Sequence, residues 1–510
     1  MKERTLYMSF TPRQLINKTE YSLPRGADHS LLDSLTVNSL CRDSRAASSG
    51  SLFVCIKGAN FDGHEYASAA YMNGCRAFVA EHVISLPEDA LTILVSDSRK
   101  ALALLSDVFF GHPSSELSVI GITGTKGKTT TALTAYQLLN SLGFKAGYIG
   151  SNGVEFDGSF LPTVNTTPES YDLHRYMRLM VDRGVKYLVM EVSSQAIYMN
   201  RIYGLSFAST VYTNLSPDHI GGNEHPTFEH YRDSKKRLFT EYGSKNIIYN
   251  ADDPYAEYMI DGSGSQSFSC SLSGRGDLCA VNVSRMSKTG AVGSEFFITD
   301  GRKYYSTAVR SPGSFSVYNA LLAAAICLSA GAPLDRIAKL LPQISVKGRF
   351  ESVDVLPGVA IMIDYAHNGV SLRSALTALR EYTEGRLICL FGSVGGRTKG
   401  RRRELGDAAA SLADFSIITS DNPDFEPPEE IISDIEQSFI SAGKLPGRDY
   451  VTIADRREAI EYAVRSARRG DVILLAGKGH EDTQLICGRD VPFSERAILT
   501  EAALRVKNPV

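Results

Sequence analysis

The segment Leu117-Ser-Val-Ile-Gly-Ile-Thr-Gly-Thr-Lys-Gly-Lys-Thr-Thr130 decides the fold of the chain around it. Its apolar first half predicts a buried strand over 117–122, and a helical pattern over 131–142 follows the glycine-rich turn. In a strand–turn–helix unit of this kind, backbone N–H groups and the helix amino terminus converge on phosphate oxygens. The segment therefore predicts a phosphate-binding loop.

The residue types in the turn suit a nucleotide. Lys128 can reach the terminal phosphates, and the Thr129 hydroxyl can bind Mg²⁺. Ile122 occupies the place of the first glycine in the general pattern G-x-x-x-x-G-K-[ST], so the match to that pattern is imperfect. The loop predicts nucleotide binding but does not by itself separate a kinase, a GTPase, a transporter motor and a ligase. The nucleotide contacts expected here are Gly124, Thr125, Lys126, Gly127, Lys128, Thr129 and Thr130.

Outside the loop, the chain divides at two polar turns, near residues 113 and 347. They predict three domains, 1–112, 113–347 and 348–510, as the length of 510 residues also suggests. Apolar runs alternate with helical patterns in the second and third segments, which predicts an α/β fold with parallel sheets. In the third segment the runs 386–391, 415–419 and 472–475 each end in a polar or glycine-rich loop, where ligands of such sheets bind.

Composition excludes several classes of protein. With 54 basic and 57 acidic residues the net charge is -3, so no global field favours nucleic acid or an anionic membrane. The most apolar stretch, 320–332, is too short to span a bilayer and predicts a buried helix. Residues 1–24 lack the features of a secretory signal, so we expect a cytoplasmic protein with its eight scattered cysteines reduced.

Several motifs, taken in order, resemble those of the Mur ligase family. They are GTKGKTT, Glu191-Val-Ser-Ser194, Asn214-Leu-Ser-Pro-Asp-His219, Gly348-Arg-Phe-Glu351 and Asp364-Tyr-Ala-His367. Within that family, Asp43-Ser-Arg45 and the segments around 50–64 resemble the MurE branch, the UDP-N-acetylmuramoyl-tripeptide synthetases. The resemblance implies a small UDP-binding domain, a central P-loop ATPase domain with a mainly parallel sheet, and a C-terminal Rossmann-like domain. Folylpolyglutamate synthetases share the loop but are not expected to carry this first domain.

The resemblance also implies a reaction. ATP would phosphorylate the terminal carboxylate of UDP-N-acetylmuramoyl-L-alanyl-D-glutamate, and the amine of an amino acid would displace the phosphate from the acyl phosphate. Because anions must be brought together, Mg²⁺ and fixed cations should dominate catalysis. By resemblance, Glu191 and His219 are Mg²⁺ ligands. The residues expected to contact ATP from elsewhere in the chain are Asn319, Arg349 and Asp364.

Lys235 matches a lysine that the family carbamylates with CO₂. A carbamate is an anion that can bind Mg²⁺, whereas an ammonium would repel it. Burial would favour the neutral amine that carbamylation requires. The adjacent Lys236 leaves the register open.

The resemblance places the acceptor on the first two domains. Hydroxyl groups and a guanidinium suit its carboxylates. The expected contacts are Ser44, Ala59 and Asn60 for the UDP group, and Thr166, Thr167, Ser194 and Arg201 for the muramoyl-dipeptide.

The identity of the added amino acid depends on Asp421-Asn-Pro-Asp424. Family members that add meso-diaminopimelate typically have arginine at the last position, where its fork clamps the distal carboxylate. Asp424 would repel that group and attract a side-chain ammonium, so the sequence predicts L-lysine, with L-ornithine possible. A solvent-facing Asp424 with Arg402 as the clamp would instead indicate diaminopimelate. The expected contacts of the amino acid are Arg402, Asp421, Asn422, Asp424, Gly477 and Glu481.

Two other classes of function stay open at this stage. One is a non-catalytic nucleotide-binding scaffold, against which Lys128, Glu191, His219 and Lys235 argue together. The other is a P-loop kinase, whose phosphorylated product would persist without an amine. We expect a monomer that binds no nucleic acid and no membrane.

Overall fold

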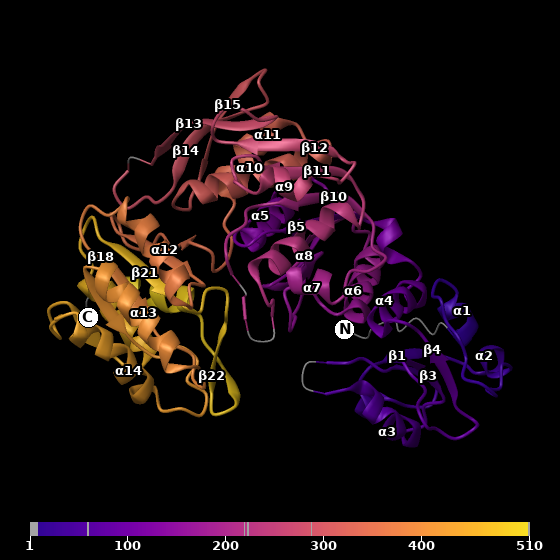
Figure 1. Cartoon of the computed structure of the whole chain (residues 1–510). Coiled ribbons are helices and arrows are strands. Elements are labelled where there is room, and N and C mark those ends of the chain that lie inside the picture. Colours follow the sequence, from indigo (N-terminus) through magenta and orange to yellow (C-terminus); the bar gives the residue numbers. More distant parts are fainter. Residues whose placement is uncertain (1–8, 59–60, 219, 222–223, 287, 508–510) are drawn as a thin grey trace. The chain divides into compact units, whose positions relative to one another are not determined.

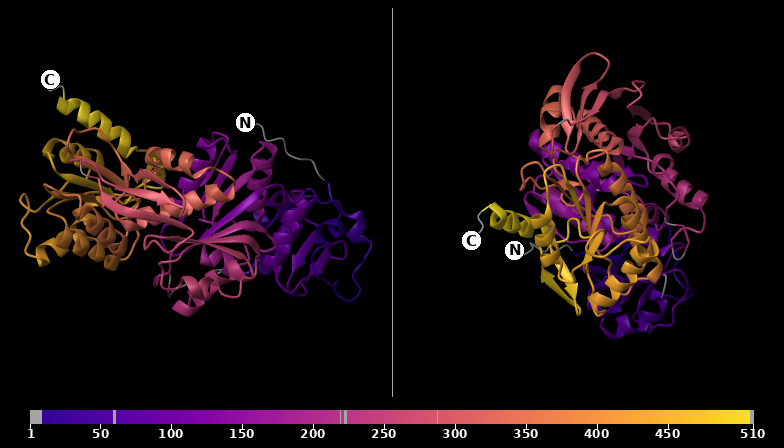
Figure 2. Two further views of the ribbon diagram at one scale, coloured as in Figure 1. Left: turned by 90° about the horizontal axis from the view of Figure 1, so that it is seen from above. Right: turned by 90° about the vertical axis from the view of Figure 1, so that its left-hand side faces the viewer.

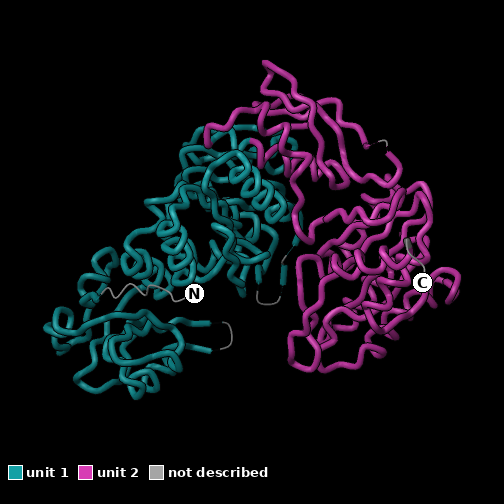
Figure 3. The backbone as a smooth tube through the Cα atoms, turned by 180° about the vertical axis from the view of Figure 1, so that it is seen from behind, with its two compact units in different colours: residues 1–270, 325–329 teal, residues 271–324, 330–510 magenta. Residues whose placement is uncertain are grey.

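The computed structural model describes residues 9–58, 61–218, 220–221, 224–286 and 288–507. The chain forms two compact units, shown in separate colours in Figure 3. Unit 1 comprises residues 1–270 and 325–329, and unit 2 comprises residues 271–324 and 330–510. The predicted central domain is thus divided between the two units, and the predicted boundaries at 113 and 347 stay predictions.

Unit 1 begins with a four-stranded parallel sheet in the order β1-β2-β3-β4, drawn in indigo and violet in Figure 1. Apolar side chains alternate between its two faces. Leu52 and Val79 pack with α1 and α4, whereas Phe53 and Phe78 pack with α3. The elements are α1 (Pro12–Ile16), α2 (Leu31–Ser34), β1 (Ser39–Cys41), β2 (Ser51–Val54), α3 (Ala67–Met72), β3 (Ala77–Ala80), β4 (Leu91–Leu94) and α4 (Ser98–Phe109).

The larger sheet of unit 1 has the order β12-β11-β10-β5-β9-β6-β7-β8. The first six of these strands run parallel, as the sequence predicted, and β7 and β8 add an antiparallel edge. Its strands are β5 (Ser118–Thr123), β6 (Ala146–Gly150), β7 (Gly153–Phe156), β8 (Ser159–Leu161), β9 (Tyr187–Glu191), β10 (Phe207–Tyr212), β11 (Ser244–Asn250) and β12 (Gln266–Ser271). Its helices are α5 (Lys128–Ser141), α6 (Ser170–Asp182), α7 (Ser194–Tyr198), α8 (Phe228–Thr240) and α9 (Ala256–Ile260).

Unit 2 opens with an antiparallel meander that the sequence patterns did not separate from the parallel sheet. It consists of β13 (Leu278–Arg285), β14 (Ser294–Thr299) and β15 (Tyr304–Val309). The helices α10 (Ser314–Ser329), whose residues 325–329 belong to unit 1, and α11 (Leu334–Leu340) follow. Residues 320–327 of α10 are all buried, which confirms the predicted buried helix. No helix among the described residues combines the length and apolar character needed to cross a membrane.

The rest of unit 2 is a doubly wound sheet in the order β16-β17-β21-β18-β19-β20, parallel except at β16. Helices α12, α13 and α14 cover one face, and α15 and α16 cover the other. The C-terminal helix α16 is the yellow helix that leads to the end marked C in Figure 2. The elements are β16 (Glu351–Ser352), β17 (Ala360–Asp364), α12 (Gly369–Arg380), β18 (Leu387–Phe391), α13 (Lys399–Leu412), β19 (Phe415–Ile418), α14 (Pro428–Ser441), β20 (Tyr450–Thr452), α15 (Arg456–Ser466), β21 (Val472–Ala476), β22 (Thr483–Ile486), β23 (Arg489–Pro492) and α16 (Glu495–Lys507).

Candidate active site

The phosphate loop lies between β5 and α5, in the strand–turn–helix context that the sequence predicted. Gly124 and Gly127 have φ angles of 149° and 83°, which side chains rarely allow. A Cβ added to Gly124 would also lie 1.9 Å from Oγ1 of Thr213, the residue after β10. The phosphate loop can therefore pack this close to the end of β10 only with glycine at position 124. Lys128 Nζ donates to the carbonyl oxygens of Gly124 and Thr125, at 2.8 and 3.1 Å. Its ammonium therefore lies over the loop where phosphate would bind.

Glu191, the last residue of β9, lies beside this loop and is fully buried. Its carboxylate accepts hydrogen bonds from Thr129 Oγ1 at 2.9 Å, from Tyr148 Oη at 2.7 Å and from the Ser151 N–H at 2.9 Å. The two predicted metal ligands Thr129 and Glu191 are thus in direct contact. A buried carboxylate with this many donors keeps a defined orientation, as a ligand of a hard cation needs.

Lys235 lies on the buried face of α8, and its side chain reaches the same loop. Lys235 Nζ donates to the Gly124 carbonyl oxygen at 2.9 Å, while only 1% of the residue is exposed. Burial, and secondarily the charge of Lys128, lowers the pKa of Lys235 well below its usual value. Lys236 faces the other way, with its Nζ 3.9 Å from the exposed carboxylate of Asp261. Of the two neighbouring lysines, Lys235 is therefore the one whose amine reaches the phosphate loop.

The predicted acceptor residues lie on the other side of Glu191. Thr166 Oγ1 is 2.9 Å from Ser151 Oγ, and Thr167 Oγ1 donates to the Glu191 carbonyl oxygen at 2.9 Å. Arg201 Nη1 donates to the Thr167 carbonyl oxygen at 3.2 Å. A short network through Ser151 and Glu191 thus joins the acceptor loop to the phosphate loop.

Arg201 and Ser194 are both held by further side chains. Arg201 Nε lies 2.9 Å from Glu169, whose other oxygen is 3.4 Å from Arg99 on α4. Ser194 Oγ lies 2.9 Å from Nε2 of the buried His225. The acceptor loop is therefore tied to the first domain through an Arg–Glu–Arg bridge within unit 1.

Part of the predicted set cannot be placed. Ala59, Asn60 and His219 lie outside the described residues. Ser44 begins a short 3₁₀ turn after β1, at the carboxyl-end edge of the small sheet, and its carbonyl oxygen accepts from Asn73 Nδ2 at 2.8 Å. That edge of a parallel sheet is where ligands commonly bind.

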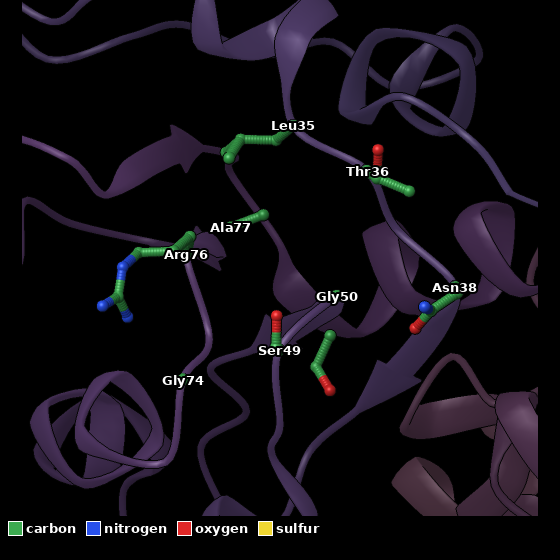
Figure 4. A pocket seen from close by; sticks show the side chains of 9 residues that line it. Leu35, Thr36, Asn38, Ser49, Gly50, Gly74, Arg76 and Ala77 are labelled. Atoms are coloured by element: carbon green, nitrogen blue, oxygen red, sulfur yellow. The ribbon is translucent and has the colours of Figure 1, made fainter.

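A pocket of about 250 Å³ opens at the opposite, amino-end edge of the same sheet (Figure 4). Its lining includes Asn38, Ser49 and Arg76, which precede β1, β2 and β3. Arg76 is held there by Asp89, at 2.7 Å. Ser44, the described residue predicted to contact the UDP group, does not line this pocket.

Unit 2 carries the other residues predicted to contact ATP. Asp364 ends β17, and its carboxylate accepts from the N–H groups of Phe350 and Ala366, both at 2.9 Å. Burial raises the pKa of Asp364, against the opposing charge of Arg349.

The Arg349 guanidinium lies 5.1 Å from the centre of the Tyr365 ring, and its buried Nε has no hydrogen-bond partner among the described residues. Asn319 is buried on α10, 6% exposed.

The residues predicted to bind the amino acid gather at the carboxyl ends of β19 and β21. Asn422 Nδ2 donates to Glu481 Oε2 at 2.9 Å. A Cβ on Gly477 would lie 2.4 Å from Asp421 Oδ2, so glycine is needed for the two loops to approach. Burial raises the pKa of Asp421, while Arg456 and Lys478 oppose that rise. Gly348 also lies close to the loop that follows β21, since a Cβ added to it would lie 2.1 Å from the backbone nitrogen of His480.

Arg402 does not join this group in the structure. Its guanidinium is buried and bonds to Glu426 at 2.6 Å and to Asp434 at 2.8 Å, so it ties α13 to α14. Asp424 has a φ of 53°, and its Oδ1 accepts from the Gly488 N–H at 2.7 Å. The rotation of α13 about its axis decides which of its consecutive arginines faces the amino-acid site, and the charge pattern of the sequence did not reveal that rotation. Arg401 is the one whose charge interacts with Asp421.

Sequence reasoning missed three residues that hold the phosphate-loop site of unit 1. Tyr148 and Ser151 bind Glu191, and the Tyr231 hydroxyl donates to Thr125 Oγ1 at 3.1 Å. A further missed residue, Lys478, belongs to the amino-acid site of unit 2, where it contacts Asn422 and Glu481. Tyr231 could have been found from its position four residues before Lys235, which places both on one face of α8.

A phosphate loop backed by a buried carboxylate and a buried lysine defines a nucleotide-dependent enzyme of the P-loop class. Comparison with known sequences specifies the family. Residues 36–110 match the "Mur ligase family, catalytic domain", residues 122–327 the "Mur ligase middle domain", and residues 348–479 the "Mur ligase, glutamate ligase domain".

Relatives of known name align with almost the whole chain. The UDP-N-acetylmuramoyl-L-alanyl-D-glutamate–2,6-diaminopimelate ligase of Caldanaerobacter subterraneus subsp. tengcongensis is 38% identical over 94% of this chain and 98% of its own. The same-named ligase of Geobacillus kaustophilus is 40% identical over 90% of this chain and 93% of its own. A solved structure of a ligase of that name has 25% identity and a TM-score of 0.71, covering 98% of this chain and 100% of that one.

The chain belongs to the Mur ligase family. It is an ATP-dependent, ADP-forming ligase that joins an acid to an amino acid. The predicted three-part α/β architecture is confirmed at the level of the family.

Proposed function

We propose that the protein adds a diamino acid to the terminal carboxylate of UDP-N-acetylmuramoyl-L-alanyl-D-glutamate. The observation that carries this proposal is the position of Glu191 between two predicted sites. Its carboxylate bonds to Thr129 of the phosphate loop and, through Ser151, to Thr166 of the acceptor loop. The names of the relatives support the same acceptor.

The chemistry follows from this juxtaposition. The γ-phosphoryl group of ATP leaves the bridging oxygen of ADP and bonds to a carboxylate oxygen of the acceptor. The amine then attacks the carbonyl carbon and loses a proton, and phosphate departs as the amide bond forms. Lys128 and the loop N–H groups would hold the charge that develops on the transferred group.

The donor set near Glu191 fits Mg²⁺. Mg²⁺ typically binds one or two carboxylates together with substrate phosphates. Thr129 and Glu191 supply hard oxygen atoms beside the loop, and the described residues contain no group of three or more His, Cys, Asp or Glu side chains able to hold a metal alone. Bound Mg²⁺ would neutralise phosphate charge as a Lewis acid.

We infer that Lys235 becomes a carbamate beside this site. Its burial and lowered pKa favour the neutral amine that reacts with CO₂, and the amine lies 2.9 Å from the loop carbonyl of Gly124. The carbamate would add a second anionic oxygen ligand next to Glu191.

For the amino acid, Asp424 favours L-lysine, because a carboxylate stands where diaminopimelate enzymes typically have arginine. The Arg402 clamp that would have favoured diaminopimelate is bound to Glu426 and Asp434. Diaminopimelate is the second candidate, supported by the names of the relatives and by the exposed Arg397 in the loop before α13.

One assay tests both the ligase reaction and the identity of the added amino acid. Purified protein is given ATP, Mg²⁺ and the UDP-dipeptide with either L-lysine or meso-diaminopimelate, and released phosphate and product mass are measured. Phosphate release that requires both the dipeptide and an amino acid supports the ligase reaction. Release without either substrate contradicts it, and clear preference for diaminopimelate contradicts the interpretation of Asp424.

A further inference from the structure

Arg456 connects the two loops of the proposed amino-acid site, although it contacts none of the predicted ligands through their side chains. It is the first residue of α15, and its side chain is fully buried. Nη1 donates to the Ser420 carbonyl oxygen at 3.1 Å, and Nη2 donates to the Ala476 carbonyl oxygen at 2.9 Å. Those residues directly precede Asp421 and Gly477. One planar guanidinium therefore sets the separation of the two loops.

The partner of Arg456 comes from the C-terminal helix. Glu495 Oε1 accepts from Arg456 Nε at 2.9 Å, and its side chain is 2% exposed. Its Oε2 is buried with no hydrogen-bond partner among the described residues. A buried ion pair carries a large desolvation cost, so it is weak evidence of stabilisation and points instead to a geometric role.

Lys478 holds the side chains of the same site. Its ammonium is fully buried and donates to Asn422 Oδ1 and Glu481 Oε2, both at 2.9 Å. Asn422 Nδ2 also donates to Glu481 Oε2, which closes a three-membered network. Because both partners of Lys478 are predicted ligands of the amino acid, the lysine determines how their remaining polar atoms point.

We propose that Arg456 and Lys478 are positioning residues for the amino-acid site, Arg456 through the backbone of its two loops and Lys478 through the side chains of Asn422 and Glu481. This inference rests on the proposed ligase function. Lys478 orients the Glu481 carboxylate before the amino acid arrives, and the charges of Arg456 and Lys478 both act on the buried Asp421 carboxylate. Such preorganisation lowers the cost of binding.

The test separates positioning from general stabilisation. We compare Lys478→Met and Arg456→Lys with wild type, measuring KM for the diamino acid, for ATP and for the UDP-dipeptide. We expect the KM for the diamino acid to rise about tenfold or more and the other two to stay within about twofold. Formation of ADP from ATP and dipeptide in a single turnover without amino acid should also stay unchanged. An unchanged KM for the diamino acid, or an equal rise in all three KM values, would overturn the proposal.

The neighbouring pair Arg457–Glu501 supplies a matched control. It joins the same two helices at 2.9 Å, but its side chains are 48% and 53% exposed. Arg457→Met should leave every KM unchanged. If a primary variant fails to fold, Glu495→Asp keeps the charge but withdraws the acceptor of Arg456 by one methylene, and an unchanged amino-acid KM in that variant counts against the proposal.

The outcomes distinguish this inference from the proposed function. If wild-type protein releases no phosphate with the dipeptide and either diamino acid, the proposed function is wrong. If wild type turns over and the variants keep its KM for the diamino acid, only the positioning role is wrong.

Discussion

Lys235 donates from Nζ to the carbonyl oxygen of Gly124, 111 residues earlier in the chain, at 2.9 Å. The lysine belongs to α8 and the glycine to the turn after β5, so the packing of the helix against the sheet brings an amine to the edge of the phosphate loop. Because this amine is buried and next to Lys128, its pKa falls well below the usual value. The lowered pKa favours the neutral form of this amine at the edge of the phosphate loop, and two of the expected outcomes follow from that.

Replacing Lys235 with alanine should reduce phosphate release by about 100-fold or more, the scale seen when a preorganised charge is removed from a transition state. Small carboxylates such as acetate should restore part of the rate by filling the space of the carbamate. Lys236→Ala is the control, since that side chain points to Asp261. Full activity of Lys235→Ala would exclude the carbamate.

The same lysine should make stability depend on pH. Its pKa is lower in the folded state than in the unfolded state, so the unfolded chain binds the extra proton and stability rises with pH between the two values. Lys235→Met should therefore raise the free energy of unfolding at pH 7 and reduce this rise. Denaturant unfolding at pH 7 and pH 9, without bicarbonate, measures both effects. An unaltered pH slope in the variant would contradict the burial of a neutral amine.

Glu191→Gln should lower kcat by about 100-fold or more, because an amide cannot replace the charge of a carboxylate beside Mg²⁺. The variant should also need more Mg²⁺ for half-maximal rate. The exposed Glu229 on α8 gives a control, Glu229→Gln, that should change neither quantity. Titration of Mg²⁺ against phosphate release provides the measurement, and an unaltered Mg²⁺ requirement would argue against Glu191 as a ligand.

Gly124→Ala should abolish ATP binding, because the added Cβ would lie 1.9 Å from Thr213 Oγ1 at a φ of 149°. Gly400→Ala in α13 has no neighbour closer than 4.0 Å and should stabilise the protein by about 0.5–1 kcal/mol, as alanine does in a helix. Calorimetric titration with ATP and thermal unfolding check the two variants. Normal ATP affinity in Gly124→Ala would show that the loop can move away from β10.

Arg402→Met should lower the free energy of unfolding by about 3 kcal/mol, because it leaves Glu426 and Asp434 without their shared partner. The exposed Arg403, 3.7 Å from Asp407, provides the control Arg403→Met, with an expected change below about 0.5 kcal/mol. Urea unfolding of the two variants gives the comparison. Equal stability would mean that the Arg402 fork is not a structural clamp.

The sequence by itself determined the local units. The strand, glycine turn and helix at 117–142 follow from periodicity and from the backbone freedom of glycine, and the apolar runs of the last domain became the parallel strands of the doubly wound sheet. Those features depend on neighbouring residues, so patterns over about ten positions reveal them. The order of the motifs also sufficed to indicate the family.

Only the tertiary structure decided which charged groups share a site. The packing face of α8 turns Lys235 inward and Lys236 outward, and the register of α13 commits Arg402 to α14. Arg456 and Glu495 meet across 39 residues because α15 and α16 cover one face of the same sheet. These pairings arise from long-range packing, which buries one side of each helix and which no local pattern of charges encodes.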